Sequence, residues 1–194
     1  MRRSGYLIQG LLFMTSARRR IASGLIACAL LAGTALGANA QSTQGATNLG
    51  TFKAWTAWQG KDDTGLVCFI AADPTSSEPK EVGGKPINRD PAVFLIVHRK
   101  GVGLKNEAQT LIGYPFKADS HPSVSIDGKS YTMVVENSAA WLAQEEDENA
   151  FVAAMKAGTS LVVKGTSARG TVTTDTYSLA GATAAMEMID KACA

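Results

Sequence analysis

The feature that most constrains this chain is a succession of short apolar or alternating segments separated by turn residues. Segments of this length and pattern predict β-strands. Because few helical patterns come between them, they predict antiparallel pairing rather than a parallel sheet. We therefore expect a mainly β fold, an antiparallel β-sandwich or open barrel of about eight strands with two short helices, one of them C-terminal. The expected strands cover residues 52–58, 66–71, 92–98, 107–112, 124–126, 130–135, 160–166 and 171–179.

Within this pattern, segment 92–98 is nearly continuous in apolar residues, which predicts a central strand covered on both faces. Asp127-Gly128 lies between two alternating segments and predicts a tight hairpin. The first helix is expected between Asp147 and Gly158, with an acidic start and a glycine stop. The second helix is expected over residues 181–193, and the residues that we expect it to turn inward are Ala184, Ala185, Met188 and Ile189.

A long polar stretch, residues 73–91, connects two of the expected strands. It contains four of the six prolines of the chain and is longer than most connections in compact domains. We interpret it as a functional or mobile loop, and as a surface for contacts with other molecules.

The first 40 residues are typical of a secretory signal. Three arginines at 18–20 precede an apolar segment, residues 21–37, and the small-x-small site Ala38-Asn39-Ala40 follows it. This order predicts export with cleavage before Gln41. The alternative is an uncleaved membrane anchor, although a spanning helix needs about 20 apolar residues. We expect a flexible mature N-terminus over residues 41–49 and a single domain over residues 50–194.

Two residues of the leader leave alternatives open. Met14 could be the true start, which would give a leader of more usual length. Leu25-Ile26-Ala27-Cys28 resembles a lipobox, which would make Cys28 a lipidated residue. Since residues 29–36 remain apolar after it, we expect Cys28 to belong to the apolar segment of the signal instead.

Removal of the leader changes the charge of the protein. The whole chain carries 19 basic and 17 acidic residues, but five arginines and no acidic residue precede Gln41. The mature chain therefore keeps 14 basic residues and has a net charge of −3. Because the mature chain is net negative, we do not expect it to bind nucleic acid or an anionic membrane. No second long apolar segment follows, so we expect no transmembrane segment in the mature chain.

The mature chain keeps two of the three cysteines, Cys68 and Cys193. An even number of cysteines in an exported protein favours a disulfide, and two cysteines allow one intramolecular pairing. We expect this bond to join an early strand to the end of the chain. The alternatives are two separate thiols, or pairing with another molecule.

Few residues in the mature chain point to catalysis. Its two histidines, His98 and His121, lie far apart in sequence, with no cysteine or carboxylate at metal-ligand spacing. We expect no metal site, no cofactor and no catalytic residue, and hence a protein that is not an enzyme. A hydrolase that uses His98 with dispersed carboxylates is the least favoured alternative.

The tryptophans are candidates for contact with a ligand or partner. Trp55 and Trp58 differ in strand parity, so they should face opposite sides of a sheet, one in the core and one partly exposed. Trp141, the third tryptophan, lies at the end of the β-rich stretch. We take Trp58 and Trp141 as candidate contact residues, because exposed aromatic side chains bind sugars and peptides well.

The order of several short motifs resembles the invasion-associated locus B family of exported bacterial proteins. The resemblance runs from about Phe52 to Cys193. Its motifs are Phe52-Lys53-Ala54-Trp55, Cys68-Phe69-Ile70, Asn106-Glu107, Ile112-Gly113-Tyr114-Pro115-Phe116, Ala139-Ala140-Trp141, Met155-Lys156-Ala157-Gly158, Asp175-Thr176-Tyr177-Ser178-Leu179-Ala180-Gly181 and Cys193.

This resemblance implies an exported, mostly β, single-domain protein of a Gram-negative envelope, in the periplasm, at the outer membrane or secreted. The family is named for a role in entry into host cells, and it supplies no catalytic motif to transfer. Our leading hypothesis is a non-enzymatic envelope protein that contacts a protein or cell-surface partner. The alternative is a periplasmic module that binds a small ligand, glycan or peptide.

Overall fold

A computed structural model describes residues 45–194, and residues 46–194 form one compact unit. The predicted signal, with Met14, Cys28 and the cleavage site before Gln41, lies outside the described residues. The first strand, β1 (Thr47–Phe52), begins inside the stretch expected to be a flexible terminus. That expectation is therefore corrected for residues 47–49, because pairing with the next strand orders them.

The strands form one antiparallel array with two free edges. Its order is β1-β2-β3-β7-β8-β11-β10-β9-β12-β13-β4. Strand β10 (Lys129–Glu136) connects two sheets, since its first half pairs with β9 and its second half with β11. We call the part from β1 to β11 sheet A and the part from β9 to β4 sheet B. The fold is mainly β and sandwich-like, as predicted, and it is not closed into a barrel.

The strands of sheet A besides β1 and β10 are β2 (Trp55–Asp62), β3 (Gly65–Ala72), β7 (Val93–Arg99), β8 (Leu104–Leu111) and β11 (Ala139–Leu142). The strands of sheet B are β9 (Ser123–Ile126), β12 (Ser160–Thr166), β13 (Val172–Ser178) and β4 (Ser76–Glu78). The helices are α1 (Glu148–Ala157) and α2 (Ala182–Ala192). Short 3-10 turns cover Lys100–Val102 and Glu145–Asp147.

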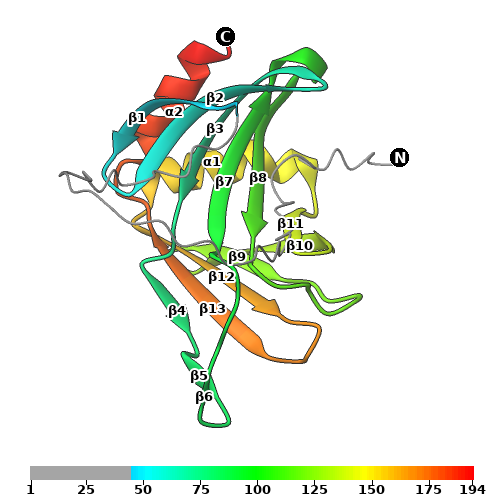
Figure 1. The fold of residues 1–194 in the computed structure, drawn as a ribbon. Helices are drawn as coiled ribbons and strands as arrows, with labels where there is room; N and C mark the ends of the chain where they lie inside the picture. Colours follow the sequence, from blue (N-terminus) through cyan, green and yellow to red (C-terminus); the bar gives the residue numbers. More distant parts are fainter. Residues whose placement is uncertain (1–44) are drawn as a thin grey trace, which may run out of the picture. The chain divides into compact units, whose positions relative to one another are not determined.

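Both helices pack against the inner face of sheet A. Figure 1 shows α1 and α2 on one side of β2, β3, β7 and β8, with the other side of these strands turned toward the reader. The main core contains Trp55, Phe94, Phe151 and Tyr177, all fully buried. No helix among the described residues is long and apolar enough to cross a membrane.

The start of the domain differs from the expected single strand over residues 52–58. The chain reverses at Lys53, which has a positive φ of 53°, so that β1 and β2 form a hairpin. Ala54 then donates its N–H to the carbonyl of Ala180, at the start of the turn before α2. The sequence did not reveal this turn for two reasons. The alternation of apolar and polar residues continues across it, and the turn contains no glycine or proline.

Helix α2 is rotated relative to the expectation. Ala185 and Ile189 are buried as predicted, but Ala184 is exposed and Met188 is only half-buried. The buried stripe instead begins at the first helical residue and follows the i, i+3, i+4, i+7 spacing of one helix face. Its members are Ala182, Ala185, Met186 and Ile189.

Residues 73–91 form an arm rather than an unstructured loop. Strand β4 pairs with β13 at the edge of sheet B, and β5 (Glu81–Val82) and β6 (Lys85–Pro86) form a small hairpin beyond it. Figure 1 shows this hairpin at the lower end of the view. Val82, at its tip, is 49% exposed. Strands of two or three residues are too short to show a period, so the sequence could not reveal them.

Candidate functional site

Trp58 and Trp141 lie on the same face of sheet A, although 83 residues and several strands separate them. Trp141 is directly opposite Gln109, which is opposite Leu95. Trp58 lies one row away, opposite Phe69. The structure therefore places the two tryptophans that the sequence singled out on one face of the sheet, but not in contact.

Trp55 occupies the other face of sheet A, as strand parity predicted. Its ring is fully buried, and its Nε1–H donates to the carbonyl of Ser178 at 2.9 Å. Trp58, by contrast, is half-buried. Trp55 is thus a core residue, which leaves Trp58 and Trp141 as the tryptophans on the outer side.

The outer side of sheet A carries a second apolar cluster that is separate from the main core. Val67, Leu95 and Val97 are buried there, with Phe69 beside them, and all of these residues come from β3 and β7. The rings of Trp58 and Phe69 stack at 6.4 Å between centroids. We call this surface the aromatic face and define it by Trp58, Phe69, Leu95, Val97, Gln109 and Trp141.

The aromatic face is broad and follows a sheet rather than a pocket. Trp58 lies on β2 and Trp141 on β11, four strands away in the sheet order. At about 4.8 Å per interstrand step, the two side chains are about 19 Å apart across the sheet. Val134, opposite Trp141, and Leu111, in the next row on the same face, are 38% and 37% exposed. Such a surface matches the contact area of a macromolecule better than a small-molecule pocket, which is normally concave.

One polar side chain is buried within the aromatic face. Gln109 is only 6% exposed, and its Oε1 has no hydrogen-bond partner. Its cross-strand neighbours on this face are Leu95 and Trp141. The face therefore contains an unused hydrogen-bond acceptor between an aliphatic and an aromatic side chain.

One end of the aromatic face carries a charged group of three side chains. Arg99 donates to Glu107 at 2.7 Å and to Asp62 at 3.2 Å. Burial alone would raise the pKa of the Asp62 carboxyl, but hydrogen bonds from Thr64 and Arg99 outweigh it and hold the pKa below its usual range. Arg99 thus contacts both carboxylates, and this group of three side chains has one positive and two negative charges.

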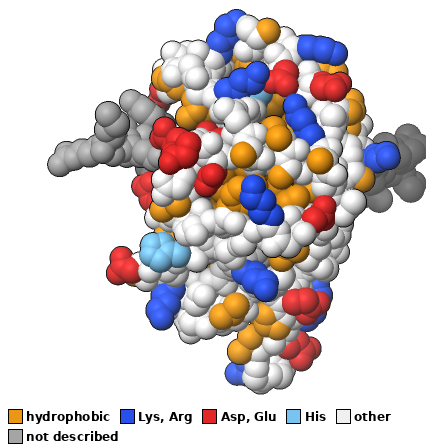
Figure 2. Space-filling model, turned by 180° about the vertical axis from the view of Figure 1, so that it is seen from behind, with side chains coloured by type: hydrophobic (Ala, Val, Ile, Leu, Met, Phe, Trp, Pro, Cys, Tyr) orange, Lys and Arg blue, Asp and Glu red, His pale blue; other side chains and the backbone are white. Residues whose placement is uncertain are grey.

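The opposite side of the domain differs in its charge distribution. Figure 2 shows basic and acidic side chains spread over that side, with a group of hydrophobic side chains near the middle. On the aromatic face, Arg99 is the cation, while Asp62, Glu107 and, beyond Val134, the exposed Glu136 are acidic. The aromatic face is therefore apolar with a mildly acidic border.

His98 lies between Asn106 of β8 and Asp190 of α2. Its Nε2 donates to Oδ1 of Asn106 at 3.2 Å, and its Nδ1 lies 3.9 Å from Asp190. Burial lowers the pKa of this imidazole, and it outweighs the opposing effects of Asn106 and Asp190. His121 lies elsewhere, lining a shallow hollow with Lys164. Within residues 45–194, no group of three His, Cys, Asp or Glu side chains could hold a metal ion.

Cys68 and Cys193 form a disulfide that fastens the end of α2 to sheet A. Their Cα atoms are 6.0 Å apart, across 125 residues of sequence. Cys68 is fully buried in β3, opposite His98 of β7. The bond predicted from the cysteine count therefore has the expected pairing, and it holds α2 on the inner face, opposite the aromatic face.

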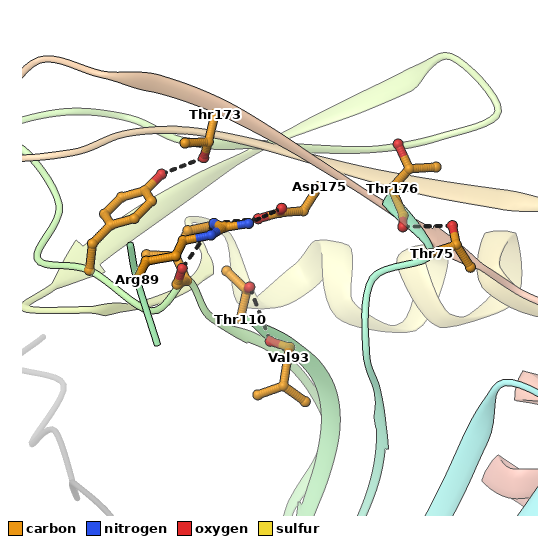
Figure 3. A network of polar contacts seen from close by, with 9 residues as sticks. Thr75, Arg89, Val93, Thr110, Thr173, Asp175 and Thr176 are labelled. Carbon is orange, nitrogen blue, oxygen red and sulfur yellow. Dashed lines mark hydrogen bonds and ion pairs between the residues drawn. The ribbon is translucent and has the colours of Figure 1, made fainter. Parts of the chain in front are cut away.

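The arm is anchored at both ends to β13, through neighbouring residues. At one end, the N–H and Oγ1 of Thr75 both donate to the carbonyl of Thr176. At the other end, Arg89 donates with both Nη atoms to Asp175, which is fully buried, and with Nη1 to the carbonyl of Ile112 at 3.1 Å. Figure 3 shows these contacts converging on β13.

The Arg89–Asp175 pair has further polar neighbours. The hydroxyl group of Tyr114 hydrogen-bonds to that of Thr173 at 2.6 Å, and the Tyr114 ring lies 5.7 Å from the guanidinium. Burial alone would lower the pKa of Arg89, but the Asp175 carboxylate outweighs it and raises the pKa above its ordinary value. This network holds the base of the arm.

Sequence reasoning missed Gln109 and the Arg89–Asp175 pair. Gln109 lies in an alternating segment, so its outward parity could be read, but its neighbours depend on the register of three strands. The arginine and the aspartate are 86 residues apart, and no local pattern links them.

The comparisons with known proteins agree with the resemblance found in the sequence. A profile of the invasion-associated locus B (IalB) proteins matches residues 56–190, well over half of the chain. The chain belongs to the invasion-associated locus B family. No curated protein sequence matches it. Among solved structures, it resembles the crystal structure of invasion-associated protein B from Bartonella henselae.

That resemblance is distant. The two chains are 15% identical, the match covers 75% of this chain and 97% of the Bartonella chain, and the TM-score is 0.44. The family assignment of this chain therefore rests on the profile match.

Proposed function

We propose that this IalB-family protein is an exported, non-enzymatic envelope protein that binds a protein partner through the aromatic face. The observation that carries the proposal is that Trp58, Phe69, Leu95, Val97 and Trp141 share one face of sheet A, while both helices pack on the other face. Trp58, Phe69 and Trp141 are the partly exposed members of this set, over the buried Leu95 and Val97. Exposed apolar surface marks interaction sites, and tryptophan is enriched among the residues that dominate binding energy.

The chemistry of the border favours a protein partner with apolar side chains and basic residues around them. Arg99 is already paired with two carboxylates, and Glu136 adds a third on the far side. A surface with this charge repels anionic lipid headgroups and attracts cations. A second copy of the chain would bring two acidic borders together, so a different protein fits better.

The disulfide supports export, because such bonds persist outside the cytoplasm. Cell fractionation of the native host with mass spectrometry of the mature N-terminus tests this part. A mature protein that begins at Gln41 in the periplasmic, outer-membrane or secreted fraction is the expected result. A cytoplasmic protein that retains residues 1–40 would contradict it.

The partner-binding face is tested by site-specific photocrosslinking in the native host. A photoreactive phenylalanine replaces Leu111 or Val134, which are exposed at the edge of the aromatic face, or Val172, which is 60% exposed on β13. We expect Leu111 and Val134 to give the same discrete protein adduct and Val172 to give none. The adduct should also disappear when Trp58→Ser is added.

Adducts of equal yield from all three positions, or none from the face, would contradict the proposal. Circular dichroism of each purified variant shows whether the fold is retained. A glycan-binding role for the same tryptophans would instead give no protein adduct but a shift of Trp58 fluorescence with oligosaccharides, and this outcome also overturns the protein-partner proposal.

A further inference from the structure

We infer that the outer side of sheet B binds an acidic glycan. Lys164 holds a carboxylate group of the sugar chain, and the serine and threonine side chains around it hydrogen-bond to the sugar hydroxyl groups. This surface is separate from the aromatic face, and the inference goes beyond the proposed partner binding, because it assigns the domain a second site for a ligand of different chemistry.

The first step is the composition of this side of sheet B. Strand register places six serine and threonine side chains there, in two neighbouring cross-strand rows. One row is Thr132, Ser123, Lys164 and Thr174, and the other is Ser130, Ser125, Val162 and Thr176. We call these eight residues the hydroxyl face. Val163, between the two central residues on β12, points to the opposite side, into the main core. Figure 1 shows both helices above the strands of sheet B, so the hydroxyl face carries no helix.

The second step is the accessibility of these hydroxyl groups. All six side chains are exposed or half-buried, and none forms a hydrogen bond with another residue in the described part of the chain. In sheet A, by contrast, the hydroxyl groups of Thr51 and Thr56 pair with each other at 3.2 Å. Each hydroxyl can donate and accept. The face is therefore an open grid of hydrogen-bonding groups, about 4.8 Å apart between strands and about 7 Å apart along them.

The third step is the charge at the centre of the grid. Lys164 is exposed and forms no ion pair within residues 45–194, although this part of the chain is net negative. Glu78 is the acidic residue in its row, but it lies two strands away, about 10 Å across the sheet. Lys164 also lines a shallow hollow with His121, Ser123 and Thr166. An unpaired cation beside a hollow with N–H and O–H donors suits an anionic group.

The fourth step is the choice between classes of ligand. Protein interfaces are enriched in aromatic residues and depleted in serine and lysine, whereas the hydroxyl face has no aromatic side chain. Its large apolar side chain, Val162, is half-buried. Anionic membranes are bound by clusters of several basic residues, and this face has one. A sugar chain with carboxylate groups can use both the hydroxyl grid and Lys164, so an acidic glycan fits best.

The experiment uses tetragalacturonic acid and its fully methyl-esterified form, which have the same sugar chain with and without negative charge. Monomeric galacturonic acid is the third probe, because it has the carboxylate without the chain. The isotope-labelled mature protein is titrated with each probe, and the backbone amide signals are followed by NMR. Lys164→Gln removes the central cation. Lys61→Gln, at an exposed position of β2 in sheet A, is the control with the same change of charge.

We expect tetragalacturonic acid to shift the amide signals of Ser123, Lys164 and Thr174. Its dissociation constant should rise about tenfold in Lys164→Gln and about threefold in Thr174→Val, which keeps the side-chain shape without the hydroxyl group. It should stay unchanged in Lys61→Gln. The esterified and monomeric probes should each bind about tenfold more weakly than the charged chain. Trp58→Ser should bind it like the wild type, which separates this site from the aromatic face.

The other outcomes overturn the inference. Equal binding of the charged and esterified chains would show that the carboxylates are not recognised, and equal binding of the monomer would reduce the site to a simple anion contact. If no probe shifts the signals of the hydroxyl face, the inference is wrong while the aromatic face remains a separate proposal. Shifts caused by protein concentration alone, or by phosphatidylglycerol vesicles, would assign the face to a second copy of the chain or to a membrane.

Discussion

Arg89 and Asp175 form a buried ion pair that joins the end of the arm to β13. The two residues are 86 positions apart in the sequence, and the carboxylate is fully buried while the arginine side chain is 12% exposed. Together with the contact of Thr75 with Thr176, this pair fixes both ends of a segment that extends away from the sheets. The arm therefore has a defined base, which a mobile loop of the same length would lack.

Removal of one partner of this pair should destabilise the folded domain. In Asp175→Ala, the guanidinium of Arg89 stays largely buried without its carboxylate, and we expect a loss of about 3–5 kcal/mol in the free energy of unfolding. Urea denaturation of the purified domain measures it. Lys105→Ala is the matched control, because Lys105 forms an ion pair with Asp190 but is 62% exposed, and we expect a loss below about 1 kcal/mol. Equal losses in the two variants would contradict a structural role for the buried pair.

The arm also depends on close backbone contact at Gly113. This residue has a φ of +81°, and a Cβ there would lie 1.9 Å from the carbonyl oxygen of Asp90. Because a backbone atom must move, we expect Gly113→Ala to destabilise the domain by about 3 kcal/mol or more. Gly83, at the tip of the arm, has a φ of +59° and open space around it, so Gly83→Ala should cost only about 1 kcal/mol. Thermal unfolding of both variants tests whether Gly113→Ala is the less stable of the two. Similar melting temperatures would contradict this prediction.

The sequence predicts those parts of the fold in which neighbouring residues carry the signal. Alternation located most strands, Asp127-Gly128 marked the hairpin of β9 and β10, and the cysteine count predicted the disulfide. The alternation of side chains along a strand was enough to predict that Trp55 and Trp58 face opposite sides of the sheet. Each of these features can be predicted from the periodicity of a single element or from the oxidising environment of an exported protein.

The parts that the sequence could not predict depend on the register between distant strands. That Trp58 and Trp141 share a face follows from four successive strand pairings, and a shift of one residue in any of them would reverse it. The same holds for the outward-facing residues of β7, of which Leu95 lies opposite Gln109. The inward face of α2 was also misplaced, since its alanines and methionines allow more than one apolar stripe, one with Met186 and one with Met188.

The disulfide should contribute strongly to stability. It closes 125 residues of sequence, for which the chain-entropy model gives about 4–5 kcal/mol. We therefore expect a much lower melting temperature in the presence of a reductant. The double variant Cys68→Ala/Cys193→Ala is the control, and its melting temperature should be low and unaffected by the reductant. Two reactive thiols in the native, unreduced protein would show that the bond is absent.

The stability of the domain should also fall on acidification because of His98. Burial lowers the pKa of this imidazole in the folded protein relative to its ordinary value of 6.5, which the unfolded chain retains. As the pH falls below that value, the unfolded chain binds a proton that the folded protein resists, so protonation favours unfolding. Burial is the largest cause of the lowered pKa, and the charges of Lys105 and Lys156 act in the same direction; together they outweigh Asn106 and Asp190, which raise the pKa.

Urea denaturation at pH 7.5, 6.5 and 5.5 measures this effect. We expect the free energy of unfolding of the wild type to be highest at pH 7.5 and to decrease toward pH 5.5. His98→Gln keeps an amide N–H for Asn106 but has no group that titrates in this range, so its profile should be flatter. Since the carboxylates titrate in both proteins, the difference between the two profiles isolates the imidazole. Parallel profiles would show that His98 has the same proton affinity in the folded and unfolded states.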